Sequence, residues 1–123
     1  KLVVVSGQVP AIDGRVAFTG AVGPGGLPVE QGHAAARQCM VNVIAQLRAA
    51  CGGDLDRVAR VVRLGGFITS APGFTGQAQV MNGASDLAVA VFGDAGRHAD
   101  RGARVPALPA DAAVEVEGMF ELA

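Results

Sequence analysis

Large aromatic side chains are almost absent from this sequence. Its 123 residues include no tryptophan, no tyrosine and only five phenylalanines. A hydrophobic core must therefore be packed from small aliphatic side chains, mainly valine and alanine. Half of the residues are apolar and 17% are charged, a balance that offsets the entropic cost of ordering the chain and excludes intrinsic disorder. The length suits one domain spanning residues 1–123.

An excess of charge of either sign is also missing. Ten basic residues stand against eleven acidic ones, giving a formal net charge of −1. Nucleic-acid binding without sequence preference needs a basic stripe and aromatic platforms, so we expect no nucleic-acid partner. The apolar runs are far shorter than the roughly 20 residues that span a bilayer, and no signal-like segment opens the chain. These absences predict a soluble protein without membrane association.

Cysteine and histidine are too sparse for a disulfide framework or a metal centre. Cys39 and Cys51 fall in one predicted helix, about 18 Å apart along its axis, which is too far for a disulfide. We therefore expect two buried thiols in a reducing compartment and a cytoplasmic location. His33 and His98 have no second ligand three or four residues away, whereas zinc takes three or four ligands. No metal site is predicted.

Apolar periodicity predicts two helices among five strands. Apolar residues recur at spacings of three and four between 29 and 51, with Pro28 before them and Gly52-Gly53 after them, which is typical of a helix. A second helix is expected over 75–92. Strands are expected over 2–6, 16–21, 57–68, 103–108 and from 114 onward.

The order β-β-α-β-α-β-β favours an α+β sandwich of two layers, with both helices on one face of the sheet. The first two strands should pair as a hairpin around the turn at Asp13-Gly14. Gly65-Gly66 should mark a bulge or a close backbone approach. In the last strand, Val114 and Val116 share one face and the intervening glutamates the other. The uncovered sheet face is also expected to be apolar and to favour oligomerisation.

Several local motifs occur in a characteristic order from the first strand to the last. They are Ser6-Gly7-Gln8-Val9-Pro10, Ala35-Ala36-Arg37-Gln38, Asn82-Gly83-Ala84-Ser85-Asp86-Leu87, Leu108-Pro109 and Val114-Glu115-Val116-Glu117. Together they resemble the RidA family, also called the YjgF family, and the Asn82 segment looks closer to a bacterial subgroup than to its best-known deaminases. The resemblance implies a chorismate-mutase-like fold, a homotrimer and a cleft at each subunit interface.

The resemblance also implies a chemistry. Deaminases of this family hydrolyse enamines and imines to 2-keto acids and ammonium without a cofactor, so the expected ligand is a small carboxylate-bearing molecule. Glu115 matches the family carboxylate that orients the attacking water, although a solvated acidic face shared with Glu117 and Glu121 would explain it too. Ser6 and Gly7 match the pocket-lining motif, whereas a Ser-Gly pair at a strand end also caps turns.

One position departs from the family pattern. Counting back from Leu108-Pro109, Asp100 stands where the deaminases carry the arginine that clamps the substrate carboxylate, and the reversed sign would oppose binding by several kcal/mol at about 4 Å. Arg101 could replace it after a one-residue slip, although a regular strand would turn it to the opposite face; Arg104 is four residues further on. Gly102 stands at the family cysteine, where its backbone N–H could still donate. The family's pocket tyrosine normally precedes the first strand, where this sequence begins, so it either lies outside these 123 residues or is absent.

Two functions follow as hypotheses. The first is an imine deaminase acting at intersubunit clefts through Glu115, Ser6, Gly7, Arg101 and Gly102. The second is a non-catalytic, ligand-binding or regulatory trimer silenced by Asp100. Ribonuclease activity, attributed to some relatives, finds no basic surface here. Arg57, Arg60 and Arg63 lie along one predicted strand without forming a stripe, and we expect them to be solvated or to lie between subunits.

Overall fold

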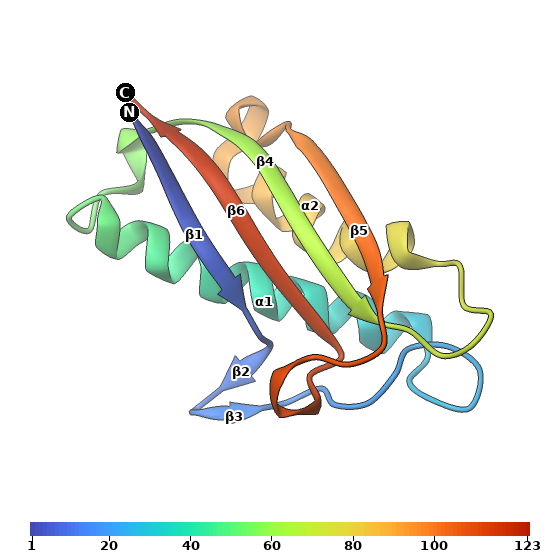
Figure 1. The fold of residues 1–123 in the computed structure, drawn as a ribbon. Coiled ribbons are helices and arrows are strands. Elements are labelled where there is room, and N and C mark those ends of the chain that lie inside the picture. The colour runs from blue at the N-terminus through green and yellow to red at the C-terminus, as the bar shows by residue number, and fades with distance from the viewer.

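The computed structural model describes residues 1–123 and contains two long helices and one main sheet (Figure 1). The helices and the strands of that sheet are β1 (Leu2–Gln8), α1 (Val29–Ala50), β4 (Val58–Thr69), α2 (Gln77–Phe92), β5 (Ala99–Val105) and β6 (Val114–Leu122). Two-residue strands β2 (Ala11–Ile12) and β3 (Arg15–Val16) form a separate small hairpin. Short 3-10 turns cover Leu55–Arg57, Gly93–Gly96 and Pro109–Asp111.

The main sheet is mixed, with strand order β1-β6-β4-β5. β6 is antiparallel to both of its neighbours, whereas β5 runs parallel to β4. Both helices lie behind the same face of this sheet, and no helix covers its other face (Figure 1). This arrangement confirms the α+β prediction with two helices on one face. No helix is long and apolar enough to cross a bilayer.

The predicted hairpin between the first two strands is wrong. β1 pairs with β6 instead, and the segment after residue 16 crosses the end of the sheet as a loop, where the Val22 amide donates to the Thr69 carbonyl at 2.8 Å. The turn at Asp13-Gly14, both at positive φ (52° and 79°), closes directly between Ile12 and Arg15. The hairpin is therefore confined to residues 11–16, and Pro10 separates it from β1.

Helix α1 follows its predicted bounds to within a residue and supplies one side of the core. Its apolar stripe, Ala36, Met40, Val43 and Leu47, is fully buried. Both cysteines are free and buried, as expected. Gly83 of α2 lies against the His33 carbonyl of α1, where a Cβ would overlap the backbone, so this glycine lets the two helices pack closely.

Strand β5 begins four residues earlier than the predicted strand over 103–108 and ends at Val105. Parallel pairing with β4 fixes its start, because Ala99 lies beside Arg63 and Val105 beside Thr69. Pro106 follows at once, and a proline has no N–H for a ladder hydrogen bond. Local sequence therefore determines where β5 ends, whereas its start depends on a partner strand.

The predicted feature at Gly65-Gly66 also differs from the structure. The register shifts of β4 fall earlier, between Val58 and Arg60 and between Val61 and Arg63. At the glycines, side chains rather than another backbone come close: Glu117 lies over Gly65 and the Met81 sulfur lies over Gly66. Because Gly65 and Gly66 point to opposite faces, one admits a carboxylate to the open face and the other a core side chain.

Candidate functional site

The candidate site lies on the open face of the sheet. Val114, Val116 and Phe120 of β6 are fully buried toward the helices, whereas alternate residues of the strand are half-buried on the opposite face, namely Glu115, Glu117, Met119 and Glu121. On neighbouring β1, Leu2 is 57% and Val4 69% exposed on that open face. The face therefore combines uncovered apolar side chains with a row of carboxylates, as the alternation in β6 predicts.

A bulge in β1 brings Gly7 against Glu115. Val5 pairs with Gly118 and Gln8 with Val116, so Ser6 and Gly7 together stand opposite a single residue of β6. A Cβ at Gly7 would clash with the carboxylate of Glu115. The glycine thus creates the space in which this carboxylate lies against the β1 backbone, with Ser6 exposed beside it. The structure thus brings Glu115 to the Ser6-Gly7 motif, from which it is far removed in the sequence.

The carboxylate of Glu115 forms no ion pair and no side-chain hydrogen bond within the protomer. Glu121, on the same face of the same strand, differs: it accepts a hydrogen bond from Arg60 Nε at 3.0 Å. The acidic face is therefore not uniform. One glutamate is engaged by a partner, whereas Glu115 is free to act on water or a ligand.

Arg101 lines a hollow of about 170 Å³ on the same open face. It pairs with Gly65 on one side, and Glu117 pairs with Gly65 on the other. The hollow is lined by Arg63, Gly65, Gly66, Phe67, Arg101, Ala103 and Glu117. Within the protomer Phe67 lies between Glu115 and Ala103 in the ladder, so the Glu115 carboxylate and this hollow are neighbouring but distinct parts of the face.

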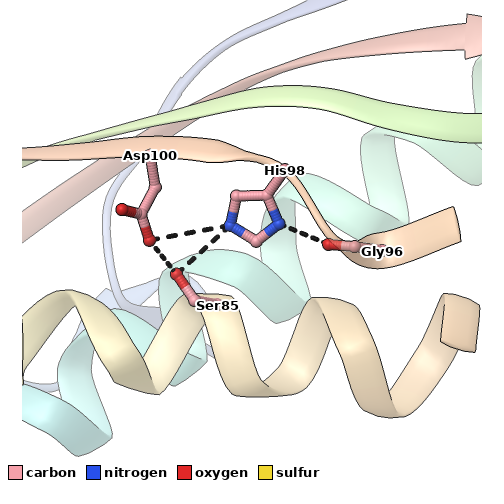
Figure 2. Close-up of polar contacts among 4 residues, drawn as sticks. All are labelled: Ser85, Gly96, His98 and Asp100. Atoms are coloured by element: carbon pink, nitrogen blue, oxygen red, sulfur yellow. Dashed lines mark hydrogen bonds and ion pairs between the residues drawn. The ribbon is translucent and has the colours of Figure 1, made fainter. Parts of the chain in front are cut away.

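Asp100 points the other way, toward α2. Ser85 Oγ donates a hydrogen bond to its carboxylate, and His98 Nε2 lies 3.6 Å from the same oxygen (Figure 2). Because Asp100 pairs with Leu64 and Arg101 with Gly65, the two residues face opposite sides of a regular strand. The expected change of face between 100 and 101 is confirmed, and Arg101 reaches the open face without a bulge.

The remaining candidates on β5 lie on the helix side of the sheet. Gly102 pairs with Gly66, and a Cβ there would meet the Gln77 carbonyl of α2 at 3.1 Å. Arg104 pairs with Ile68, a core residue, so its Cβ starts from the same side. Of the five predicted site residues, four therefore belong to the open face and Gly102 does not.

Sequence reasoning missed the cluster of Ser85, His98 and Asp100. His98 is nearly enclosed, with a 4% exposed side chain; its Nδ1 lies against the Gly96 carbonyl and its Nε2 lies 3.3 Å from Ser85 Oγ (Figure 2). In a hydrolytic triad the carboxylate holds the nitrogen that does not face the serine. Here hydroxyl and carboxylate share one nitrogen, and Ser85 lines no hollow, so the cluster ties α2 to β5.

The buried thiol of Cys39 lies beneath the catalytic candidate. Its Sγ is 3.4 Å from the Val114 carbonyl, on the strand that carries Glu115. Burial raises the pKa of the Cys39 thiol far above its usual range, and the negative charge of Glu115 adds to the shift. A thiol kept protonated is a poor nucleophile and metal ligand, so Cys39 serves packing.

A mixed four-stranded sheet with two helices on one face, and an open face bearing unpaired acidic and basic groups, defines an α+β protein of the chorismate-mutase-like class. Residues 1–122 match the family model described as "YjgF/chorismate_mutase-like, putative endoribonuclease". The chain belongs to the YjgF family, also called the RidA family.

Known relatives cover nearly the whole chain. Protein TCP17 of Trypanosoma cruzi is 51% identical over 119 residues, which are 96% of this chain and 73% of that protein. The crystal structure of Atu1372 from Agrobacterium tumefaciens is 43% identical with a TM-score of 0.96, over 99% of this chain and 77% of that one. A putative endoribonuclease from Shewanella oneidensis is 34% identical with a TM-score of 0.93, over 98% and 79% of the two chains.

Proposed function

We propose that the protein is a hydrolase that converts 2-imino acids to 2-keto acids and ammonium. The observation that carries the proposal is that Arg101 and Glu115, both without partners, share the open face while Asp100 is turned toward α2. An arginine for the substrate carboxylate and a free carboxylate for water are the two charges that this chemistry requires. Family membership supports the same chemistry.

Each residue has a separate task in the reaction. Arg101 holds the substrate carboxylate with its two-donor guanidinium fork. Glu115 takes a proton from the water whose oxygen adds to the imine carbon, and it returns that proton to the nitrogen before the C–N bond breaks. It then takes the remaining hydroxyl proton, which passes to the departing ammonia to give ammonium. Ser6 and Gly7 shape the wall beside Glu115. Gly102 has no task in this scheme, because it faces the helix layer, and no cofactor is required.

A homotrimer completes the proposal. The open face of one protomer leaves Leu2 and Val4 largely exposed, and burying such residues against neighbouring copies is favourable. A second protomer placed over this face would also exclude water from the unpaired charges, which strengthens their interaction with a substrate. Two free, buried cysteines support the expected cytoplasmic location.

The alternative of a non-catalytic trimer rested on Asp100 opposing the substrate carboxylate. With the side chain of Asp100 bonded to Ser85 on the helix side, this reason is removed, and the hydrolase is favoured. The endoribonuclease in the family description is not supported by the charge balance, since ten basic residues face eleven acidic ones.

The test follows keto-acid release from 2-aminoacrylate or a 2-imino acid that a pyridoxal-phosphate enzyme produces in the same vessel. We expect the protein to accelerate release, and Glu115→Gln to lower kcat by about 10²–10⁴-fold, the range of general-base catalysis. Glu121→Gln is the matched control, because Glu121 shares the strand and face but is bonded to Arg60. Light scattering of the same samples measures the trimer.

Arg101→Gln should raise KM, whereas Asp100→Asn should leave kcat/KM within about twofold. Failure of the unmodified protein to accelerate release over buffer would contradict the proposal. Equal losses in the Glu115 and Glu121 variants would contradict the role of Glu115 while leaving the activity in place.

A further inference from the structure

We infer that the hollow around Gly65 selects acidic substrates, with Arg63 binding the side-chain carboxylate of a 2-imino dicarboxylic acid whose other carboxylate is held by Arg101. The inference rests on the proposed function and narrows its substrate class. It assigns Arg63 and Glu117 to substrate recognition.

The geometry of the sheet places the two arginines on either side of the Glu117 carboxylate, which lies over Gly65. Arg63 precedes Gly65 by two residues on the same face, and Arg101 lies beside Gly65 on β5. With strands about 4.8 Å apart and a rise of about 3.3 Å per residue, the Cα atoms of Arg63 and Arg101 are about 8 Å apart. Two long side chains at this separation can hold the two ends of one small molecule.

The charges of the hollow complement those of the proposed substrate. Arg63 and Arg101 carry two positive charges and Glu117 one negative charge, and none of the three has an ion pair within the protomer. A protonated 2-imino dicarboxylate carries two negative charges and one positive charge. A monocarboxylate would occupy one guanidinium and leave the other unused. On the same strand and face, Arg60 is already bonded to Glu121, so Arg63 is the free cation next to Arg101.

The size of the hollow limits the ligand. A volume of about 170 Å³ is below the roughly 300 Å³ at which sites for drug-sized ligands begin, so a compact metabolite fits better than a nucleotide or a peptide. Phe67 and Ala103 add an apolar wall on which a short methylene chain can lie. Four or five carbons between and including the two carboxylates suit this space.

Hydrolysis of such a substrate balances without any further reactant. Glu115 pairs with Phe67, which lines the hollow, so Glu115 stands beside the hollow rather than in its lining. Water entering from that side adds its oxygen to C2 of the iminium ion and gives a proton to Glu115. That proton passes to nitrogen and the C2–N bond breaks, while the remaining hydroxyl proton moves through Glu115 to the departing ammonia. The products are a 2-keto dicarboxylate and ammonium. Glu117 faces the cationic nitrogen end of the substrate and contributes to its orientation, while both arginines retain their carboxylates throughout.

The experiment compares two product keto acids by calorimetric titration of the intact protein. We expect 2-oxoglutarate, a dicarboxylate, to bind at least tenfold more tightly than 2-oxobutanoate, a monocarboxylate. Arg63→Gln should bring the two affinities to within about threefold of each other by weakening only the dicarboxylate. Arg60→Gln is the matched control and should leave the ratio unchanged, because Arg60 is bonded to Glu121.

Equal affinities of the two keto acids for the unmodified protein would overturn the inference without any variant, even if Arg63→Gln disturbed assembly. The inference would also be overturned if Arg63→Gln kept the preference for the dicarboxylate, or if Arg60→Gln lost that preference to the same extent. A second experiment compares the hydrolysis of imines from neutral amino acids with that of imines made from glutamate by an oxidase. If both are hydrolysed at equal rates, the proposed function stands and this inference fails. If neither imine is hydrolysed while 2-oxoglutarate still binds through Arg63, the proposed hydrolase activity fails, whereas the recognition of dicarboxylates by Arg63 stands.

Discussion

The two faces of the sheet are made by alternate residues of the same strands and differ sharply. On β6, Val116 and Phe120 are fully buried beneath the helices, whereas Glu115 and Glu117 stay partly exposed on the open side. The helix side contributes most of the buried apolar area and therefore most of the stability. The open side carries unpaired charges that contribute little to folding. The two-residue period of a strand thus separates the residues that stabilise the fold from those to which we assign the proposed chemistry.

The largest expected effect tests the stability side of this comparison. Phe120→Ala should lower the free energy of unfolding by about 3–5 kcal/mol, because Phe120 is fully buried and its ring lies 6.5 Å from that of Phe92. Met119→Ala, one residue away on the open face, should cost less than about 1 kcal/mol in the isolated protomer. Urea titrations at one fixed protein concentration measure both, and equal losses would show that the two faces of the sheet contribute alike to stability.

Alanine substitutions at two glycines test the helix side and the open side of the sheet together. Gly83→Ala should cost about 1–3 kcal/mol, because its Cβ would press on the α1 backbone at His33 and neither helix can yield easily. Gly7→Ala should leave the melting temperature nearly unchanged, since the atoms nearest its Cβ belong to the Glu115 side chain, which can rotate away, yet lower imine hydrolysis about 10²-fold by displacing that carboxylate. Loss of stability at Gly7 with full activity would contradict the assignment.

Alkaline pH probes the layer between the two faces. Folding raises the pKa of Cys39 above its ordinary value of 9.0, so the folded chain keeps a proton that the unfolded chain releases. Stability should therefore be level below about pH 8 and fall above pH 9, with a slope approaching about 1.4 kcal/mol per pH unit. Cys39→Ala should remove that slope. With no tyrosine and a single lysine, Lys1, few other groups titrate in this range.

The smallest effect is expected at the edge strand. Asp100→Asn removes a charged acceptor from Ser85, but the Asp100 side chain is 38% exposed, so the loss in unfolding free energy should stay below about 1 kcal/mol. Asp100→Arg should not raise the rate of imine hydrolysis, because the new side chain would start on the helix side. A gain of activity in Asp100→Arg would show that position 100 reaches the substrate.

Elements governed by local periodicity could be predicted from the sequence. Helix α1 and strand β6 occupy the expected residues because an apolar stripe and a strict alternation identify them without a partner. The second strand was misplaced, since alternation after Val16 looks the same in a strand and in a loop crossing the sheet end. Only the distant contact with Thr69 and Ala113 decides between them.

The candidate site also contains residues that local sequence predicts and residues that it does not. Glu115, Ser6 and Gly7 follow from motifs, whereas the facing of Asp100 and Arg101 depends on the parallel register with β4. The hollow could not be predicted, because Arg63, Arg101 and Glu117 come from three strands that meet only around Gly65. The register between strands depends on residues that are distant in the sequence, so a short segment does not predict it.

The parallel register of β5 against β4 sets which of two opposite charges, Asp100 or Arg101, is displayed on the open face. Adding or deleting one residue between Arg101 and Pro106, with the strand still anchored by Pro106, would exchange the outward positions of this acid and this base. Descendants of such a chain could invert the proposed preference of the hollow without a single substitution, so length variation in this strand is as informative about ligand choice as the identity of any side chain.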